Sequence, residues 1–135
     1  MDNLTSRIIE FYDKISSWEH SVVRDSGLTP AQMHAVEVIG HAGQLRMKEL
    51  AEQMGLTTGT ITLMVDRLEK HGAAIRKPHE NDRRSILVAL TEKGKKLFEE
   101  HHKLHMKLTT DLCADLTDSE SELLATLLAK MNSQI

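Results

Sequence analysis

The residues best placed to do chemistry are two histidines in the second half of the chain. His101 and His105 lie four residues apart in a stretch with helical periodicity, on the same stripe as Phe98. Residues four apart project from one face of a helix, so the two imidazoles could bind one metal ion. Two partly buried histidines held by hydrogen bonds would give the same pattern. The pair therefore predicts either a metal site or a structural pair, and His102 falls off the stripe.

A second set of functional candidates is cationic. The chain has a net charge of −3, but residues 67–96 contain nine lysines and arginines against four acidic residues, a local charge of +5. Binding to phosphate requires a local cluster of positive charge and does not require a positive net charge of the whole chain. Within it, Asp82 is followed by Arg83 and Arg84 in a predicted turn. These arginines form a solvated loop if nothing binds them, or a probe of the DNA minor groove if DNA does.

The sequence does not predict an enzyme. It contains no visible nucleophile and base pair, no glycine-rich loop that would cradle phosphate, and no paired-carboxylate motif. A metal site could in principle be catalytic, and turnover of a substrate would revive that alternative. We expect no catalytic residue.

Length and composition limit the architecture. With 135 residues, 40% of them hydrophobic and 3% aromatic, the chain is expected to form a single domain, residues 1–135, that is mostly helical. No apolar run is long enough to cross a bilayer, and the N-terminus does not resemble a secretory signal. A single cysteine, Cys113, suits a reducing compartment. We expect a cytoplasmic protein without membrane contact.

Residues 47–71 predict the element that would bind nucleic acid. Ala51, Gly55 and Ile61 have the spacing of a helix-turn-helix, with the glycine in the turn. The second helix, residues 58–70, would turn its polar face toward the DNA major groove. An amphipathic hairpin in an ordinary helical domain is the alternative. The candidate contacts in this segment are Thr57, Thr58, Gly59, Thr60, Thr62, Leu63 and Arg67.

The remaining elements would hold this unit in place. Residues 74–77 and 86–90 predict a two-stranded wing that carries Lys77, and residues 78–82 have turn chemistry. Helices are predicted over residues 3–24, from Thr29-Pro30 to the glycines 40 and 43, over residues 91–113, and from Thr117 onward. Apolar stripes at both ends of the chain indicate a homodimer.

The segments LAEQMGLTTGTITLMVDRLEKHG and NDRRSILVALTEKG resemble the recognition element and the wing signature of MarR-family transcriptional regulators. This resemblance implies a homodimeric winged helix-turn-helix protein, mainly α, that binds a double-stranded DNA operator and is expected to be a repressor. It implies a DNA-binding lobe over residues 28–91 and dimerisation helices over 1–27 and 92–135. By the motif match, Arg84 would enter the minor groove and Asp82 would orient it. Many members have a basic residue where this chain has Leu63.

The histidine pattern also resembles the zinc-responsive branch of that family. The match implies His34, His101 and His105 as metal ligands, with Glu19 or His20 as the fourth. A divalent metal such as zinc would then be the effector. The alternatives are a phenolic or other anionic organic ligand in the cleft beside the DNA-binding lobe, and a winged-helix module that binds protein instead of DNA.

Overall fold

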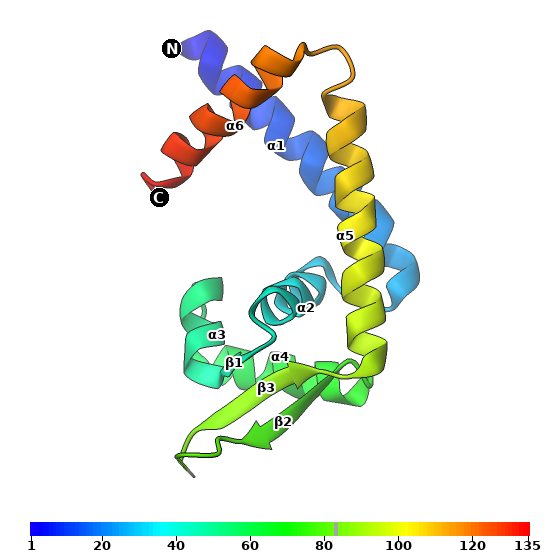
Figure 1. Ribbon diagram of the computed structural model, residues 1–135, viewed down its shortest axis with the longest axis vertical. Helices are drawn as coiled ribbons and strands as arrows, with labels where there is room; N and C mark the ends of the chain where they lie inside the picture. The colour runs from blue at the N-terminus through cyan, green and yellow to red at the C-terminus, as the bar shows by residue number, and fades with distance from the viewer. Residues whose placement is uncertain (83) are drawn as a thin grey trace. The chain divides into compact units, whose positions relative to one another are not determined.

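The computed structural model describes residues 1–82 and 84–135, and Arg83 lies outside the described residues. In chain order its elements are α1 (Asp2–Val23), the 3-10 helix η1 (Arg24–Ser26), α2 (Pro30–Ala42), β1 (Gln44–Arg46), α3 (Met47–Met54), α4 (Thr58–Lys70), β2 (Ala74–Pro78), β3 (Ile86–Leu90), α5 (Glu92–Leu112) and α6 (Asp118–Asn132) (Figure 1). This arrangement confirms the predicted mainly α fold with a winged helix-turn-helix.

The chain divides into two compact units, Met1–His102 and Lys103–Ile135, and the division falls within the continuous helix α5. The first unit holds the elements from α1 to β3 and the first half of α5. The second unit holds the rest of α5 and all of α6. The predicted separation of a DNA-binding lobe from dimerisation helices stays a prediction. No helix within the described residues is long and apolar enough to span a membrane.

Local signals in the sequence set the helix boundaries. Thr29 caps α2 by accepting a hydrogen bond from the backbone N–H of Gln32, and the Gln32 side chain accepts the Thr29 N–H in return. Gly55 ends α3 in the left-handed conformation, with φ of 66°. That conformation is strained for residues with a Cβ, which is why the turn needs glycine. The predicted helix over residues 3–24 is also present, although its last turn tightens into η1.

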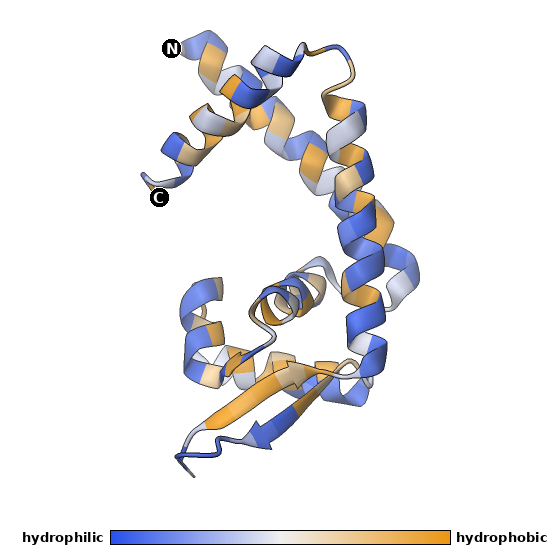
Figure 2. Ribbon diagram, viewed as in Figure 1, coloured by the Kyte–Doolittle hydropathy of each residue, from blue (hydrophilic) through white to orange (hydrophobic). Residues whose placement is uncertain are grey.

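The sheet has one strand more than predicted. The order is β1-β3-β2, and both neighbours of β3 are antiparallel to it. The sequence analysis expected only β2 and β3. In β1, Leu45 pairs with Val88 and is the one buried residue of the strand. Figure 2 shows β3 as the apolar strand and much of β2 as hydrophilic.

One hydrophobic core holds the first unit together. It contains residues from α2, α3, α4 and the sheet, and α2 contacts both β3 and α3. The largest side chains that are fully buried there are Val23, Val36, Ile39, Leu50, Ile61, Val65, Leu68 and Val88. Exposed and buried residues do not alternate along β3, because Ile86 is 47% exposed whereas Val88, Ala89 and Leu90 are all buried. Ile86 begins the strand at the turn of the wing.

Candidate DNA-binding surface

The second helix of the helix-turn-helix, α4, presents the face that its sequence predicts. Its buried stripe is Ile61, Val65 and Leu68, each with no exposed surface. The opposite face is open to solvent, and Leu63 on it is 60% exposed. The exposed candidate residues on this helix are Thr58, Gly59, Thr60, Thr62, Leu63 and Arg67.

Two of the predicted contact residues also hold the helix start. The Thr57 hydroxyl accepts a hydrogen bond from the Thr60 N–H at 3.2 Å and donates one to the Thr60 hydroxyl at 2.9 Å. These bonds form an N-cap, which stabilises a helix start by satisfying one of its orphan N–H groups. The hydroxyls of Thr57 and Thr60 are therefore engaged locally, and the Thr62 hydroxyl donates to the Thr58 carbonyl at 2.9 Å. Thr58 and Thr62 line the adjoining cleft.

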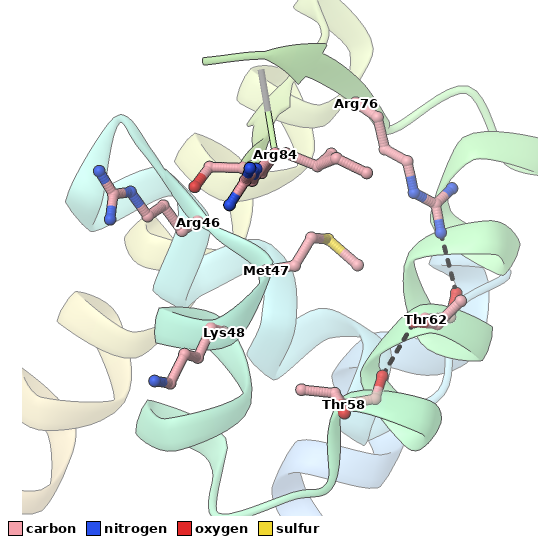
Figure 3. Close-up of a pocket in the computed structure, with 9 residues that line it drawn as sticks. Arg46, Met47, Lys48, Thr58, Thr62, Arg76 and Arg84 are labelled. Atoms are coloured by element: carbon pink, nitrogen blue, oxygen red, sulfur yellow. Dashed lines mark hydrogen bonds between the residues drawn. The ribbon is translucent and has the colours of Figure 1, made fainter. Parts of the chain in front are cut away.

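A cleft of about 450 Å³ lies where α4, the start of α3 and the wing meet. Figure 3 shows Arg46, Lys48 and Arg84 across the opening from Thr58 and Thr62, with the Met47 side chain between the two groups. Cations beside hydroxyl groups suit phosphate and base contacts, because lysine and arginine neutralise phosphates and threonine can donate or accept. The cleft is lined by Arg46, Met47, Lys48, Thr58, Thr62, Arg76, Arg84, Ser85 and Ile86.

Arg46 and Lys48 line the cleft but were not predicted from the sequence. Arg46 ends β1, and its guanidinium Nη2 lies 3.5 Å from Nε2 of His79 in the wing turn. Lys48 stands in the first turn of α3. The cationic pair around Met47, at the start of the helix-turn-helix, was visible in the sequence. Its position beside Arg84 depends on the pairing of β1 with β3, which the sequence analysis did not predict.

Arg76, on β2, ties the wing to α4. Its Nη2 donates to the Thr62 carbonyl at 3.2 Å (Figure 3). Nη2 also donates to Asp66 Oδ1 at 2.7 Å, and Nη1 donates to Glu69. Asp66 and Glu69 would otherwise repel phosphate from the same surface. Arg76 is therefore a positioning residue that also neutralises acidic groups on α4, a role that the sequence analysis did not assign.

Asp82 orders the wing turn through the backbone. Its carboxylate accepts hydrogen bonds from the Arg84 N–H and the Ser85 hydroxyl, both at 3.0 Å. These bonds, the Arg84 N–H first, hold the pKa of the Asp82 carboxyl below its ordinary value. Arg84 is one of the residues that line the cleft, and its contact with Asp82 is made by its backbone N–H. Arg83, which was also predicted to contact DNA, lies outside the described residues.

Two other predicted cations lie on the exposed surface. Lys77, on β2, is exposed, and its Nζ lies 3.4 Å from the Gln44 side-chain oxygen. Arg67 borders a second hollow on α4 that also includes Leu63 and Lys70. Both side chains are exposed, so both are accessible to the phosphates of bound DNA.

The predicted metal ligands are only partly brought together. His101 is buried, and its Nε2 lies 2.7 Å from Glu19, one of the two alternatives for the fourth ligand. Glu37 of α2, which the sequence analysis did not select, lies 3.4 Å from the same nitrogen. His34 and His20 are exposed, and the group of ligand atoms around His101 includes neither. His105 is partly buried, one turn after His101 in α5.

The two residues of α2 differ in exposure. His34 and Glu37 are three residues apart and so are neighbours on the helix surface, but His34 is exposed whereas Glu37 is partly buried. Glu37 lies on the side where α5 packs, as its contact with His101 shows. The sequence places an acidic residue and a histidine close together on α1 and again on α2. It does not show which member of each pair lies next to His101.

The sequence profile of the MarR family matches residues 28–86. The HTH-type transcriptional regulator YcgE of Bacillus subtilis (strain 168) is 34% identical over 104 residues, which are 77% of this chain and 68% of that protein. The HTH-type transcriptional repressor MdtR of the same organism is 29% identical over 131 residues, 97% of this chain and 84% of that one. These relatives are transcriptional regulators, so the expectation that the chain is not an enzyme is confirmed.

Solved structures of similar fold cover nearly the whole chain. A mutant MarR from E. coli, complexed with operator DNA, has a TM-score of 0.75 and 30% identity, and the match covers 93% of this chain and 91% of that one. FabT of Streptococcus pneumoniae in complex with DNA has a TM-score of 0.90 at 21% identity, and the match covers 98% of this chain and 94% of that one. The FabT likeness shows the fold alone, whereas the family follows from the YcgE and MarR matches at 34% and 30% identity. The chain belongs to the MarR family of DNA-binding transcriptional regulators.

Proposed function

We propose that this protein is a transcriptional repressor that binds a double-stranded DNA operator in the cytoplasm as a homodimer. The observation that carries the proposal is the cleft, which is lined by Arg46, Lys48 and Arg84 together with the exposed Thr58 and Thr62 of α4. The helix would read base edges in the major groove while Arg84 enters the adjacent minor groove. The E. coli MarR mutant solved with operator DNA, at 30% identity, supports this assignment.

Exposed apolar helix faces support the homodimer. In the first unit, α1 exposes Leu4, Ile8 and Phe11, which are 44–54% accessible. In the second unit, α6 exposes five large apolar residues: Leu123, Leu124, Leu127, Leu128 and Met131. Apolar surface of this extent needs a partner, and a two-fold dimer places two recognition helices about one helical turn apart on DNA. The repressor role rests on the likeness to MdtR, which is named a repressor.

A divalent metal ion, zinc first, is the effector in this proposal. The support is the buried imidazole of His101, which meets carboxylates from two other helices, Glu19 of α1 and Glu37 of α2. An organic anion in the cleft beside the DNA-binding lobe is the alternative effector. Such an anion requires a cationic or apolar pocket, whereas the groups that contact His101 are the carboxylates of Glu19 and Glu37.

Selection of duplexes from a random-sequence pool tests the function directly. We expect a pseudo-palindromic duplex with half-sites about one helical turn apart, bound more tightly than the same sequence as a single strand. Equal binding of duplex and single strand would contradict operator recognition and favour a protein-interaction module. A change in affinity for the selected duplex on adding zinc would support a metal effector, and a change only with phenolic anions would overturn it.

A further inference from the structure

The solvent-exposed face of α4 carries an apolar side chain near its middle. Leu63 is 60% exposed, whereas the buried stripe of the same helix, Ile61, Val65 and Leu68, has no exposed surface. Leu63 is two residues from both Ile61 and Val65, and two residues turn a helix by about 200°. The Leu63 side chain therefore leaves the helix on the side opposite the core.

The groups beside Leu63 indicate which kind of surface could cover it. The hollow that contains Leu63 is also lined by Asp66, Arg67, Glu69 and Lys70. Arg76 pairs with both acidic residues, and Arg67 and Lys70 place further positive charge beside the leucine. An apolar group flanked by cations fits a surface that is apolar at its centre and anionic at its edges. The major groove of DNA is such a surface where a thymine methyl group lies between the two phosphate backbones.

The hydroxyl groups of this face form hydrogen bonds within the protein. The Thr57 hydroxyl donates to the Thr60 hydroxyl, and the Thr62 hydroxyl donates to the Thr58 carbonyl at 2.9 Å (Figure 3). A hydroxyl has a single proton to donate. Thr57 and Thr62 would therefore have to break an internal bond before they could donate to a base. Leu63 can contact a base edge without breaking any hydrogen bond.

A glycine lies beside Leu63 on the same face of the helix. Gly59 precedes Leu63 by four residues within α4, so the two positions are neighbours on the helix surface. Among the described residues, a Cβ built at Gly59 would meet only the Thr57 hydroxyl, 4.0 Å away. The packing of the protein therefore does not require glycine here, although glycine is a poorer helix former than alanine. Glycine does supply bare backbone, which a ligand can approach closely.

The major-groove edges of the bases offer one apolar group, the C5 methyl of thymine. A leucine side chain cannot form hydrogen bonds, so this methyl group is the feature of a base edge that it can recognise. We propose that Leu63 contacts the C5 methyl of a thymine in each half-site, and that Gly59 gives that base pair the clearance to approach α4. The inference rests on the proposed function, because it names the base chemistry that the recognition helix of a duplex-binding regulator selects.

Replacing single bases tests the contact without altering the protein. Deoxyuridine pairs as thymidine does but lacks the methyl group, so each thymidine of the selected duplex is replaced in turn. Fluorescence anisotropy measures the affinity of the parent for each duplex. At one position per half-site we expect a loss of about fourfold, the effect of one buried methyl group, and about fifteenfold when both half-sites are changed. At that position, 5-methylcytosine should likewise be bound about fourfold more tightly than cytosine.

Variants of Leu63 assign the methyl effect to this side chain. The loss on deoxyuridine substitution should vanish in Leu63→Ala, because the shortened side chain no longer reaches the methyl group. It should remain in Leu63→Met, which keeps an apolar side chain of similar length. The matched control is Ile75→Ala, which removes an exposed apolar side chain on β2 and should show the same loss as the parent.

A variant of Gly59 tests the clearance. Gly59→Ala should raise the urea midpoint of unfolding, because alanine is the better helix former. Its affinity for the selected duplex should nevertheless fall by about 5–150-fold, the cost of one mismatched base pair. A purely structural role of Gly59 would not produce these opposite effects. Duplex binding by Gly59→Ala as tight as that of the parent would overturn the clearance.

The outcomes separate this inference from the proposed function. Tight and selective duplex binding in which no thymidine can be distinguished from deoxyuridine would overturn the Leu63 contact alone. A loss on deoxyuridine substitution that persists unchanged in Leu63→Ala would also overturn it. Equal affinity of the parent for the selected duplex and for the same sequence as a single strand would instead overturn the proposed function, and the inference with it.

Discussion

On the DNA-binding surface, the acidic side chains that lie among the cations form bonds within the protein. Asp66 and Glu69 are held by Arg76, and Asp82 is turned into the backbone of the wing. Each carboxylate is thus paired within the protein, and Arg46, Lys48 and Arg84 are left to meet phosphate. This explains how a chain with net charge −3 can present a cationic surface.

The first prediction concerns the Asp82 carboxyl. Its hydrogen bonds from the Arg84 N–H and the Ser85 hydroxyl lower its pKa, so an NMR titration should find a midpoint below the ordinary value of 3.8. Because the folded-state pKa is lowered, the carboxylate stabilises the wing above the ordinary value and loses this effect as the pH falls through the lowered one. Ser85→Ala should raise the midpoint. A midpoint at or above 3.8 in the parent would show that the turn is not formed in solution.

The second prediction separates two cations of the wing. Arg84→Ala should cost about 1–3 kcal/mol of binding free energy and weaken the preference for narrow-groove sequence beside each half-site. Lys77→Ala should weaken binding to all duplexes about equally and lower the salt slope by about one, since we expect Lys77 to contact phosphate and no base. Fluorescence anisotropy with the selected and a scrambled duplex measures both. If Arg84→Ala binds both duplexes as the parent does, the wing does not enter the minor groove.

For individual residues, the sequence predicts which side chains are exposed better than it predicts which groups they contact. The exposed face of α4 follows from helical periodicity alone, and Leu63 and Arg67 are exposed as expected. The three acceptors of Arg76 could not be inferred, because they depend on how β2 packs on α4. The choice of Glu37 over His34 depends likewise on where α5 crosses α2.

Among the elements, the link between the wing and α4 is the one most open to test. Arg76 bonds two carboxylates and a carbonyl of α4 from a position on β2. It therefore fixes the angle at which the wing leaves the recognition helix. The N-cap at Thr57 fixes the other end of that helix.

The third prediction is that Arg76→Met lowers the free energy of unfolding by about 1–2 kcal/mol, since charged hydrogen bonds are lost from a partly exposed site. Urea denaturation measures it. Duplex affinity should fall further than stability alone explains, because Asp66 and Glu69 are then unpaired beside phosphate. The control is Arg7→Met, whose exposed pair with Glu10 should contribute little. Equal effects of the two substitutions would contradict the role given to Arg76.

The sequence predicts the helices well and the sheet less well, for a physical reason. Thr29, Thr57 and Thr117 are capping residues that mark helix starts locally, and all three accept the expected N–H. β1 has three residues and one buried side chain, Leu45, so no periodicity could reveal it. Its formation depends on pairing with β3, more than forty residues later in the chain.

For the whole molecule, the exposed leucines of α6 lead to the fourth prediction. Leu127→Glu should convert a dimer into a monomer in sedimentation experiments, because it places charge on an apolar interface. Ser119→Glu, at an exposed position in the first turn of the same helix, should leave the dimer intact. A parent that sediments as a monomer at micromolar concentration would contradict the homodimer.

The family and the mainly α fold were predictable for the whole molecule, because the recognition element and the wing signature are local and specific. The assembly and the effector were not, because both depend on surfaces that meet only after folding. The contacts of His101 with Glu19 and Glu37 illustrate this, since the three residues are far apart in the sequence.

The salt dependence of duplex binding tests the central claim most directly. The affinity for the selected duplex is measured from low to high salt, beside the same sequence as a single strand and a duplex with one half-site removed. We predict a steep linear fall of log affinity with log salt, by about 0.9 for each phosphate neutralised, and tight binding only when both half-sites are present. Salt-independent binding, or equal affinity for the three DNAs, would contradict the assignment of this protein as a dimeric operator-binding regulator.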